Sequence, residues 1–207
     1  MASIAGYGAI LGCAIMAVAV MIGDWLVPGN DMVADTISAM AAGPMNEIVD
    51  TGIVAFSVGL LLLGPGTAVV HPGGWKWSVG SVLLLGLGVT VFLVGFRNEY
   101  GDGDAASAEN DWHMVFVYVL GVLFALVPWL MAEGADRMRD SGGRWLRGAA
   151  ILWVLTAPWF FFMPDGYDGL YERLLGLVAF LFVIALSRRL IEWSRHGDGT
   201  DPETGGD

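Results

Sequence analysis

The stretch IVDTGIVAFSVGLLLLGPGTAVV, residues 48–70, is an almost unbroken apolar run. It holds one charged residue, Asp50, and its apolar residues are continuous instead of alternating with polar ones. A helix needs about 20 such residues to cross the hydrocarbon core of a bilayer, where it satisfies its own backbone hydrogen bonds. A strand of a membrane barrel would alternate. The run therefore predicts a transmembrane helix.

Similar apolar runs lie on both sides of this stretch: residues 4–26 before it, and 77–96, 112–131, 145–163 and 170–186 after it. Of the 207 residues, 56% are hydrophobic and 15% are charged, and the mean hydropathy is +0.63. Soluble domains are more polar than this. We therefore expect an all-α integral membrane protein with a bundle of six transmembrane helices over residues 1–190. The acidic, glycine-rich residues 191–207 are expected to form a disordered tail.

Basic residues gather on one side of the predicted bundle. Eight of the ten lie in the loop 70–76, in the loop 133–147 or after residue 187: Lys76, Arg137, Arg139, Arg144, Arg147, Arg188, Arg189 and Arg195. The positive-inside rule makes this side cytoplasmic, with both termini inside. The opposite loops are acidic and are expected to face the exterior. The protein is thus expected to be a multi-pass protein of the plasma membrane.

The net charge of −11 and the use of one lysine against nine arginines indicate a host adapted to high salt. Carboxylates keep an exposed surface hydrated and soluble under such conditions. A halophilic origin is therefore a hypothesis from composition, and it reduces the functional weight of any single exposed acid.

The residues just before residue 48 are polar. In DTISAMAAGPMNE, residues 35–47, Gly43 and Pro44 form a cap and first-turn pair that predicts the start of the second helix. Asn46, Asp50 and Ser57 follow at spacings of four and seven residues, so they share one helix face. Asp50 lies about one turn inside the outer boundary, where burial of a charge is expensive.

Other ionisable residues are predicted at a similar depth on the outer side: Asp24, Arg97, His113, Glu172 and Arg173. Two arginines among carboxylates favour ion pairs, which make burial tolerable. The cluster has two interpretations. Ion pairs could cap helix ends and hold the bundle together, since lipid supplies little hydrophobic drive for packing. Alternatively, the cluster is an outward-facing pocket whose ligand-binding residues are Asn46, Arg97, Glu172, Arg173 and Asp24.

Three segments, ISAMAAGPMNEIVDTGI, VGFRNEYGDGDAASAENDWHMVFVY and GLYERLLGL, resemble the six-helix prokaryotic membrane family catalogued as domain of unknown function 998. The resemblance spans helix one to helix six, and the matching positions are Ser38, Asn46, His113, Glu172 and Arg173. The chain departs in having Met40 where leucine is usual, and Arg97-Asn98 where a proline is common. The resemblance implies a six-helix bundle of a bacterial or archaeal membrane and no established activity.

Ser38, His113 and a carboxylate such as Asp50 or Asp35 are the residue types of an acyl-transfer triad. In such a triad the histidine deprotonates the serine and the carboxylate orients the histidine. However, nothing around Ser38 resembles the strained Gly-x-Ser-x-Gly elbow. Ser38 is equally a turn or capping residue, or a ligand contact. The catalytic interpretation and these alternatives stay open on the sequence.

Other kinds of site find little support. Of the three histidines only His113 falls on the outer side, which excludes a multi-histidine zinc centre there. No P-loop or Rossmann motif is present. The sixth predicted helix has no lysine for a retinal Schiff base. We therefore expect no cofactor and no resident metal.

The sequence favours a membrane protein whose outward-facing polar pocket binds a lipid head group, a small solute, an ion or a membrane partner. The alternative is an exofacial serine-dependent hydrolase that acts on a lipid-like substrate. Membrane lipids are the expected partners, with a second membrane protein or a second copy of the chain as further candidates. No nucleic-acid partner is expected.

Overall fold

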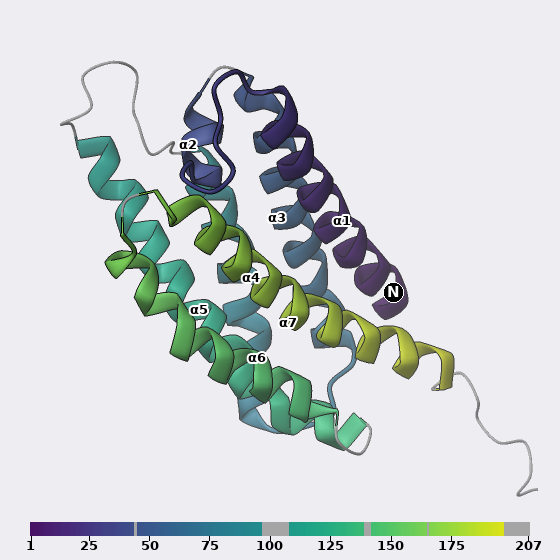
Figure 1. The fold of residues 1–207 in the computed structure, drawn as a ribbon. Helices are drawn as coiled ribbons and strands as arrows, with labels where there is room; N and C mark the ends of the chain where they lie inside the picture. Colours follow the sequence, from purple (N-terminus) through teal and green to yellow (C-terminus); the bar gives the residue numbers. More distant parts are fainter. Residues whose placement is uncertain (44, 97–107, 139–141, 165, 197–207) are drawn as a thin grey trace, which may run out of the picture.

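Apolar helices make up most of the chain. A computed structural model describes residues 1–43, 45–96, 108–138, 142–164 and 166–196 (Figure 1). In chain order the elements are α1 (Ala2–Leu26), α2 (Ile37–Ala42), α3 (Asn46–Val69), α4 (Trp75–Phe96), α5 (Ala108–Met138), α6 (Gly143–Thr156), the 3₁₀ helix η1 (Ala157–Phe162) and α7 (Asp168–His196). With α6 and η1 taken together, six helices of the described chain are long and apolar enough to cross a membrane. This confirms the expected all-α chain with six candidate spans.

The six spans pack as a closed ring in chain order. Helix α1 packs on α3, α3 on α4, α4 on α5, α5 on α6 and α6 on α7, and α7 returns to α1 (Figure 1). Successive spans run in opposite directions. The ends of α1 and α4 therefore lie at the same end of the bundle as α2 and the starts of α3, α5 and α7. We call this the acidic end, and we call the opposite one the basic end.

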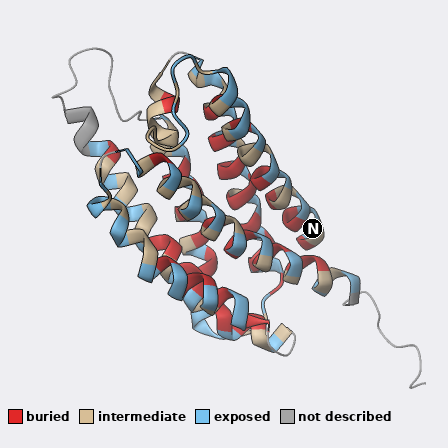
Figure 2. Cartoon of the chain, viewed as in Figure 1, coloured by how far each residue is buried: buried red, intermediate tan, exposed pale blue. Residues whose placement is uncertain are grey.

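Buried residues follow the inward faces of the spans, while the outward faces expose apolar side chains (Figure 2). The most extensive helix contact joins α1 and α3. A Cβ atom on Gly12 would lie 2.6 Å from the carbonyl oxygen of Ala55, so only a residue without a side chain fits there. The Gly8-x-x-x-Gly12 pair thus lets another helix approach closely. That helix is α3 of the same chain.

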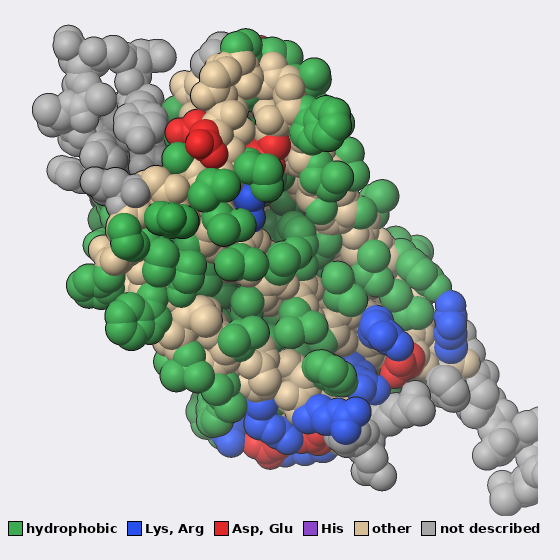
Figure 3. All heavy atoms as spheres, in the orientation of Figure 1, with side chains coloured by type: hydrophobic (Ala, Val, Ile, Leu, Met, Phe, Trp, Pro, Cys, Tyr) green, Lys and Arg blue, Asp and Glu red, His purple; other side chains and the backbone are tan. Residues whose placement is uncertain are grey.

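Lys and Arg side chains gather at the basic end, over the C-terminal part of α7 and the α3–α4 and α5–α6 turns (Figure 3). Two ion pairs connect helices there. Lys76 pairs with Glu133 at 2.9 Å, and Arg147 pairs with Asp136 at 2.5 Å. The predicted separation of charge between the two ends is therefore present in the fold. Its orientation across the membrane stays a prediction.

Several helix boundaries differ from the predicted ones. Helix α5 extends from Ala108 to Met138, beyond the predicted 112–131 at both ends. The segment before α3 forms a separate short helix, α2, and α3 then starts after Met45, whose φ of 69° is left-handed. Helix α7 continues to His196 and so includes the first residues of the expected tail. Residues 197–207 of that tail lie outside the described residues, as do Pro44 and the predicted ligand residue Arg97.

Candidate functional site at the acidic end

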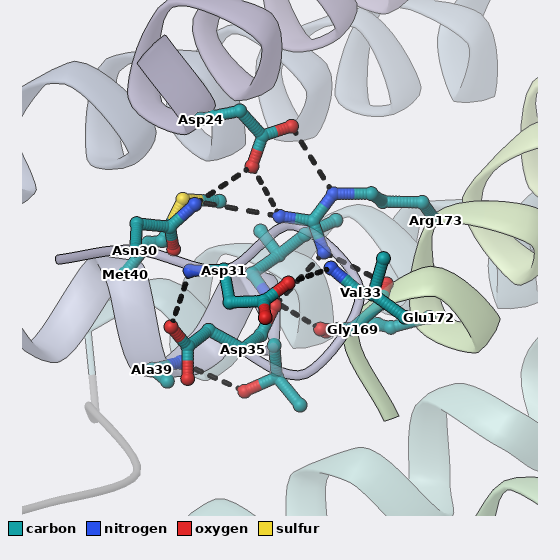
Figure 4. A network of polar contacts seen from close by, with 12 residues as sticks. Asp24, Asn30, Asp31, Val33, Asp35, Ala39, Met40, Gly169, Glu172 and Arg173 are labelled. Atoms are coloured by element: carbon teal, nitrogen blue, oxygen red, sulfur yellow. Dashed lines mark hydrogen bonds and ion pairs between the residues drawn. The ribbon is translucent and has the colours of Figure 1, made fainter. Parts of the chain in front are cut away.

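The loop after α1, residues 27–36, is held in shape by its own carboxylates (Figure 4). The Asp31 carboxylate accepts a hydrogen bond from the Val33 N–H at 2.9 Å, and the Asp35 carboxylate accepts one from the Asp31 N–H at 2.7 Å. The Leu170 N–H donates to the carbonyl oxygen of Val33 at 3.0 Å. The loop is therefore joined to the first turn of α7.

Side chains from both sides satisfy the first N–H groups of α2, which no helical partner can satisfy. The Thr36 hydroxyl accepts from the Ala39 N–H at 2.9 Å and is the N-cap. Oε2 of Glu172 accepts from the Ile37 N–H at 2.5 Å. The carboxylate of Glu172, a predicted ligand-binding group, thus holds the start of α2 against α7.

A partly buried ion pair between Asp24, near the end of α1, and Arg173, on α7, forms the centre of this network (Figure 4). The exposed fractions of the two side chains are 11% and 12%. Arg173 donates from Nη2 to Oδ1 of Asp24 and from Nε to Oδ2 at 3.2 Å. The amide of Asn30 donates to the same Oδ1 at 3.2 Å. The two charges therefore compensate each other where neither could be buried alone.

The remaining donors of Arg173 go to the backbone. Nη1 donates to the carbonyl oxygens of Asp35, at 2.9 Å, and Gly169, at 2.7 Å. We call the group formed by Asp24, Asn30, Asp35, Gly169 and Arg173 the Arg173 clasp. Every guanidinium nitrogen has a partner within the chain. A ligand that bound to Arg173 or Asp24 would first have to displace the other.

The clasp requires glycine at position 169. A Cβ atom there would lie 2.1 Å from the carbonyl oxygen of Asp35 and 2.9 Å from Nη1 of Arg173. No side chain fits such a distance to a backbone atom without a shift of the loop. Gly169 therefore lets α7 approach the loop closely enough for Arg173 to reach it.

The polar residues of α3 have different environments. Asn46 is the first residue of the helix. Ser57, two turns beyond Asp50, donates from its buried hydroxyl to the carbonyl oxygen of Gly88 at 2.8 Å. Ser57 is thus a contact between α3 and α4. For Oδ1 of Asp50, which is buried, the described part of the chain offers no hydrogen-bond partner.

The packing of α3 on α4 explains why Asp50 has no partner on that helix. Ile53, one turn deeper, meets α4 at Gly95, where a Cβ would lie 2.6 Å from Cγ2 of Ile53. Helix α4 ends at Phe96, so Asp50 lies at a level that the described part of α4 does not reach. Val54, four residues on and hence on the same face, is 42% exposed. The Asp50 face therefore borders the surface of the bundle.

The predicted catalytic residues belong to three different elements. Ser38 is a half-buried residue of α2, His113 is a buried residue of α5 at 3% exposure, and Asp50 is on α3. Among the hydrogen bonds of the described residues, none joins any two of these side chains. The acyl-transfer triad stays a prediction. The geometry shows Thr36, and not Ser38, as the cap of α2.

Glu172 and Arg173 are predicted ligand-binding residues of the outward-facing pocket, and that role stays a prediction. In the fold both residues are bonded to residues 24–37 of the same chain. The described ranges also contain no cluster of three or more His, Cys, Asp or Glu side chains able to hold a metal ion. Among the described residues of this end, Asp50 has a buried carboxylate oxygen with unused capacity to accept a hydrogen bond.

Sequence reasoning missed three residues of this end, Asn30, Thr36 and Gly169. Thr36 carried a local signal, because a threonine directly before the helix-forming residues ISAMAA is typical of an N-cap. Asn30 and Gly169 carried none. Their contacts are with segments distant in sequence, and no local pattern specifies those.

Residues 10–189 match the family model described as "Protein of unknown function (DUF998)". The match covers four of the six spans in full and most of the first and the last. No curated protein and no solved structure matches the chain.

Proposed function

The chain belongs to the DUF998 family of proteins of unknown function, and we propose that it is a membrane protein that binds a ligand beside Asp50, at the acidic end of its bundle. The observation that carries this proposal is the buried Oδ1 atom of Asp50, which lacks a hydrogen-bond partner among the described residues. A buried carboxylate oxygen without a donor is costly. A ligand that donates an N–H or O–H would remove that cost.

The negative charge of the neighbouring Glu47 favours a ligand with a cationic or neutral hydrogen-bond donor over an anionic ligand. Glu47 lies one turn before Asp50 on α3 and is exposed. Two carboxylates one turn apart on a helix repel each other and attract positive charge. An ammonium group or a hydroxyl group is therefore the expected ligand chemistry.

The position of Asp50 favours a lipid head group among the possible ligands. Val54 lies one turn deeper on the same face and is exposed, so this side of α3 is open to the surroundings of the bundle. Asp50 lies within one turn of the start of the membrane helix, which is the depth of the head groups. A lipid with an amine or hydroxyl head group would meet Asp50 at its natural depth.

The Arg173 clasp supports such a site by holding its surroundings rigid. Gly23, next to Asp24, packs against both Val49 and Met40; a Cβ on Gly23 would lie 3.2 Å from Cγ2 of Val49 and 3.3 Å from Sδ of Met40. Val49 precedes Asp50 on α3. The clasp thus fixes α1, α2 and the start of α3 together, and a site is most effective when its supporting residues are fixed.

The experiment measures the melting temperature of the purified full chain in phosphatidylcholine micelles with increasing phosphatidylethanolamine. Phosphatidylethanolamine is expected to raise the melting temperature of the wild type, because a ligand of the folded state stabilises it. Asp50→Asn is expected to lose most of this rise. Arg144→Ala, at an exposed position on the opposite end of the bundle, is the control and is expected to keep it.

Two outcomes would overturn the proposal. One is an equal response of the wild type and Asp50→Asn to phosphatidylethanolamine. The other concerns Arg97, which follows α4 in the sequence and lies outside the described residues. If Arg97→Ala lowers the melting temperature and adding Asp50→Asn restores it, the partner of Asp50 is a side chain of the protein and no ligand is needed.

A further inference from the structure

A hollow of about 620 Å³ opens at the basic end, far from the Arg173 clasp. It lies between the first turns of α1, the end of α3 and the last turns of α7. Its lining includes Ser3, Tyr7, Val69, Trp193, Ser194 and Arg195. This volume is in the range of small-molecule sites, which run from roughly 300 to 1,000 Å³.

The lining combines one positive charge with hydroxyl and aromatic groups. Arg195 is exposed and donates from Nη2 to the Tyr7 hydroxyl at 2.6 Å. Its other N–H groups have no hydrogen bond to the described part of the chain. The Ser194 hydroxyl donates to the carbonyl oxygen of Ile191 at 3.1 Å and can still accept. Arg195 therefore has free donors at the mouth of the hollow.

Among the described residues, the charge around the hollow is positive. Arg188 is exposed and lies seven residues before Arg195, on the same side of α7. The nearby acid, Glu192, pairs with Arg189 at 2.9 Å. Lys and Arg side chains gather at this end (Figure 3). An anion would thus be attracted to the hollow.

An apolar stripe leads from the hollow along the outside of α1. Ile4, Tyr7 and Leu11 are spaced by three and four residues, so they lie on one face, and they are 70%, 51% and 59% exposed. Tyr7 belongs to both the stripe and the hollow. The stripe runs from the end of the bundle toward its middle, as an acyl chain would.

We propose that this hollow binds the phosphate of an anionic phospholipid, with Arg195 as the principal donor and the acyl chain along the stripe of α1. A guanidinium presents its N–H groups in a fork that suits two phosphate oxygens. Tyrosine and tryptophan are typical of head-group depth, and basic pockets between transmembrane helices bind anionic head groups. This site is independent of the one proposed at Asp50, because the two lie at opposite ends of the bundle.

The test compares three probes on the purified full chain in phosphatidylcholine micelles: phosphatidylglycerol, glycerol 3-phosphate and inorganic phosphate. The apparent affinity is taken from the rise in melting temperature with probe concentration. Phosphatidylglycerol is expected to stabilise the wild type. Arg195→Ala is expected to weaken this affinity roughly tenfold or more, since it removes charge-assisted hydrogen bonds.

Two further variants make the result specific. Ser3→Trp fills the hollow without changing charge, so it is expected to weaken binding even if Arg195→Ala does not fold. Arg144→Ala removes an exposed arginine of the same end that packs on Trp145 and does not line the hollow. It is the matched control and is expected to bind phosphatidylglycerol as the wild type does.

The possible outcomes show whether the hollow binds an anionic phospholipid. Stabilisation by phosphatidylglycerol alone supports a lipid, and equal stabilisation by glycerol 3-phosphate or inorganic phosphate assigns the hollow to a soluble phosphate compound. No stabilisation by any of the three probes overturns the proposal. An equal loss of affinity for phosphatidylglycerol in Arg195→Ala and Arg144→Ala also overturns the proposal, and so does unchanged affinity in Ser3→Trp. In either case binding would depend only on the overall charge of the basic end.

Discussion

Arg173 is a cation within a membrane span whose five N–H donors are used by the chain itself. Its partners are the carboxylate of Asp24, two backbone carbonyl oxygens and the sulfur of Met40, at 4.0 Å. In a low-dielectric environment such a set of donors and acceptors stabilises only when it is complete. Removal of one member leaves a buried charge without compensation.

Arg173→Met and Asp24→Leu are each expected to lower the free energy of unfolding by about 3–5 kcal/mol, because each leaves the other charge buried and unpaired. The double variant is expected to be less destabilised than the sum of the two singles. Unfolding in mixed detergent micelles, followed by tryptophan fluorescence, measures these values.

Arg144→Ala again serves as the control and is expected to change the free energy of unfolding by less than about 0.5 kcal/mol. If the single variants of Arg173 and Asp24 change the free energy of unfolding as little as this control does, the pair does not hold the acidic end together.

At the scale of elements, the contact between the first turn of α7 and the loop 27–36 is a contact of backbone with backbone. The Leu170 N–H donates to the carbonyl oxygen of Val33, and Gly169 lies against the carbonyl oxygen of Asp35. A side chain cannot adapt to a neighbour that is itself backbone. The separation of the two elements is therefore set by the absence of a side chain at position 169.

Gly169→Ala is expected to destabilise the fold by about 1–3 kcal/mol, because the added Cβ would force α7 and the loop apart. Gly176→Ala is the matched control on the same helix, since a Cβ there would meet nothing within 4 Å. It is expected to be neutral or slightly stabilising, as alanine favours a helix over glycine. Thermal unfolding of both variants measures the difference, and equal effects would contradict the proposed close approach.

At the scale of the whole molecule, the two ends of the bundle differ in charge and in the way they are built. The acidic end is closed by the loop 27–36, by α2 and by the Arg173 clasp. The basic end has ion pairs between exposed side chains, such as Lys76 with Glu133, whose side chains are 48% and 49% exposed. Exposed pairs contribute little to stability. The basic end therefore depends less on specific polar contacts.

The orientation of the bundle can be tested with single cysteines. The natural Cys13 is buried and is replaced by alanine in the parent. Met32→Cys at the acidic end and Trp75→Cys at the basic end are exposed positions, at 51% and 67%. A membrane-impermeant maleimide applied to intact cells is expected to label Met32→Cys alone, because the basic end is expected to be cytoplasmic. The reverse pattern of labelling would place the basic end outside.

Sequence alone predicted the spans well and the partners of polar side chains poorly. Hydropathy sums over about 20 neighbouring residues, so errors at single positions average out. The depth of Asp24 and Arg173 could be inferred for the same reason. Their pairing could not, since the two residues are 149 positions apart. Glu172 likewise has the predicted depth, but its partner is the start of a short helix, α2, that was not predicted.

The sequence by itself determined the class of protein, the number of spans and the separation of charge between the two ends, because long apolar runs and the placement of arginines act locally and additively. The tertiary structure decided which polar groups meet. It closed the ring of six helices, directed Arg173 to Asp24 and the loop 27–36, directed Ser57 to α4, and left the buried oxygen of Asp50 without a partner among the described residues. These polar contacts depend on the rotation and register of the packed helices. Close contacts such as those at Gly12 and Gly169 set that rotation and register, and they form between segments distant in the chain.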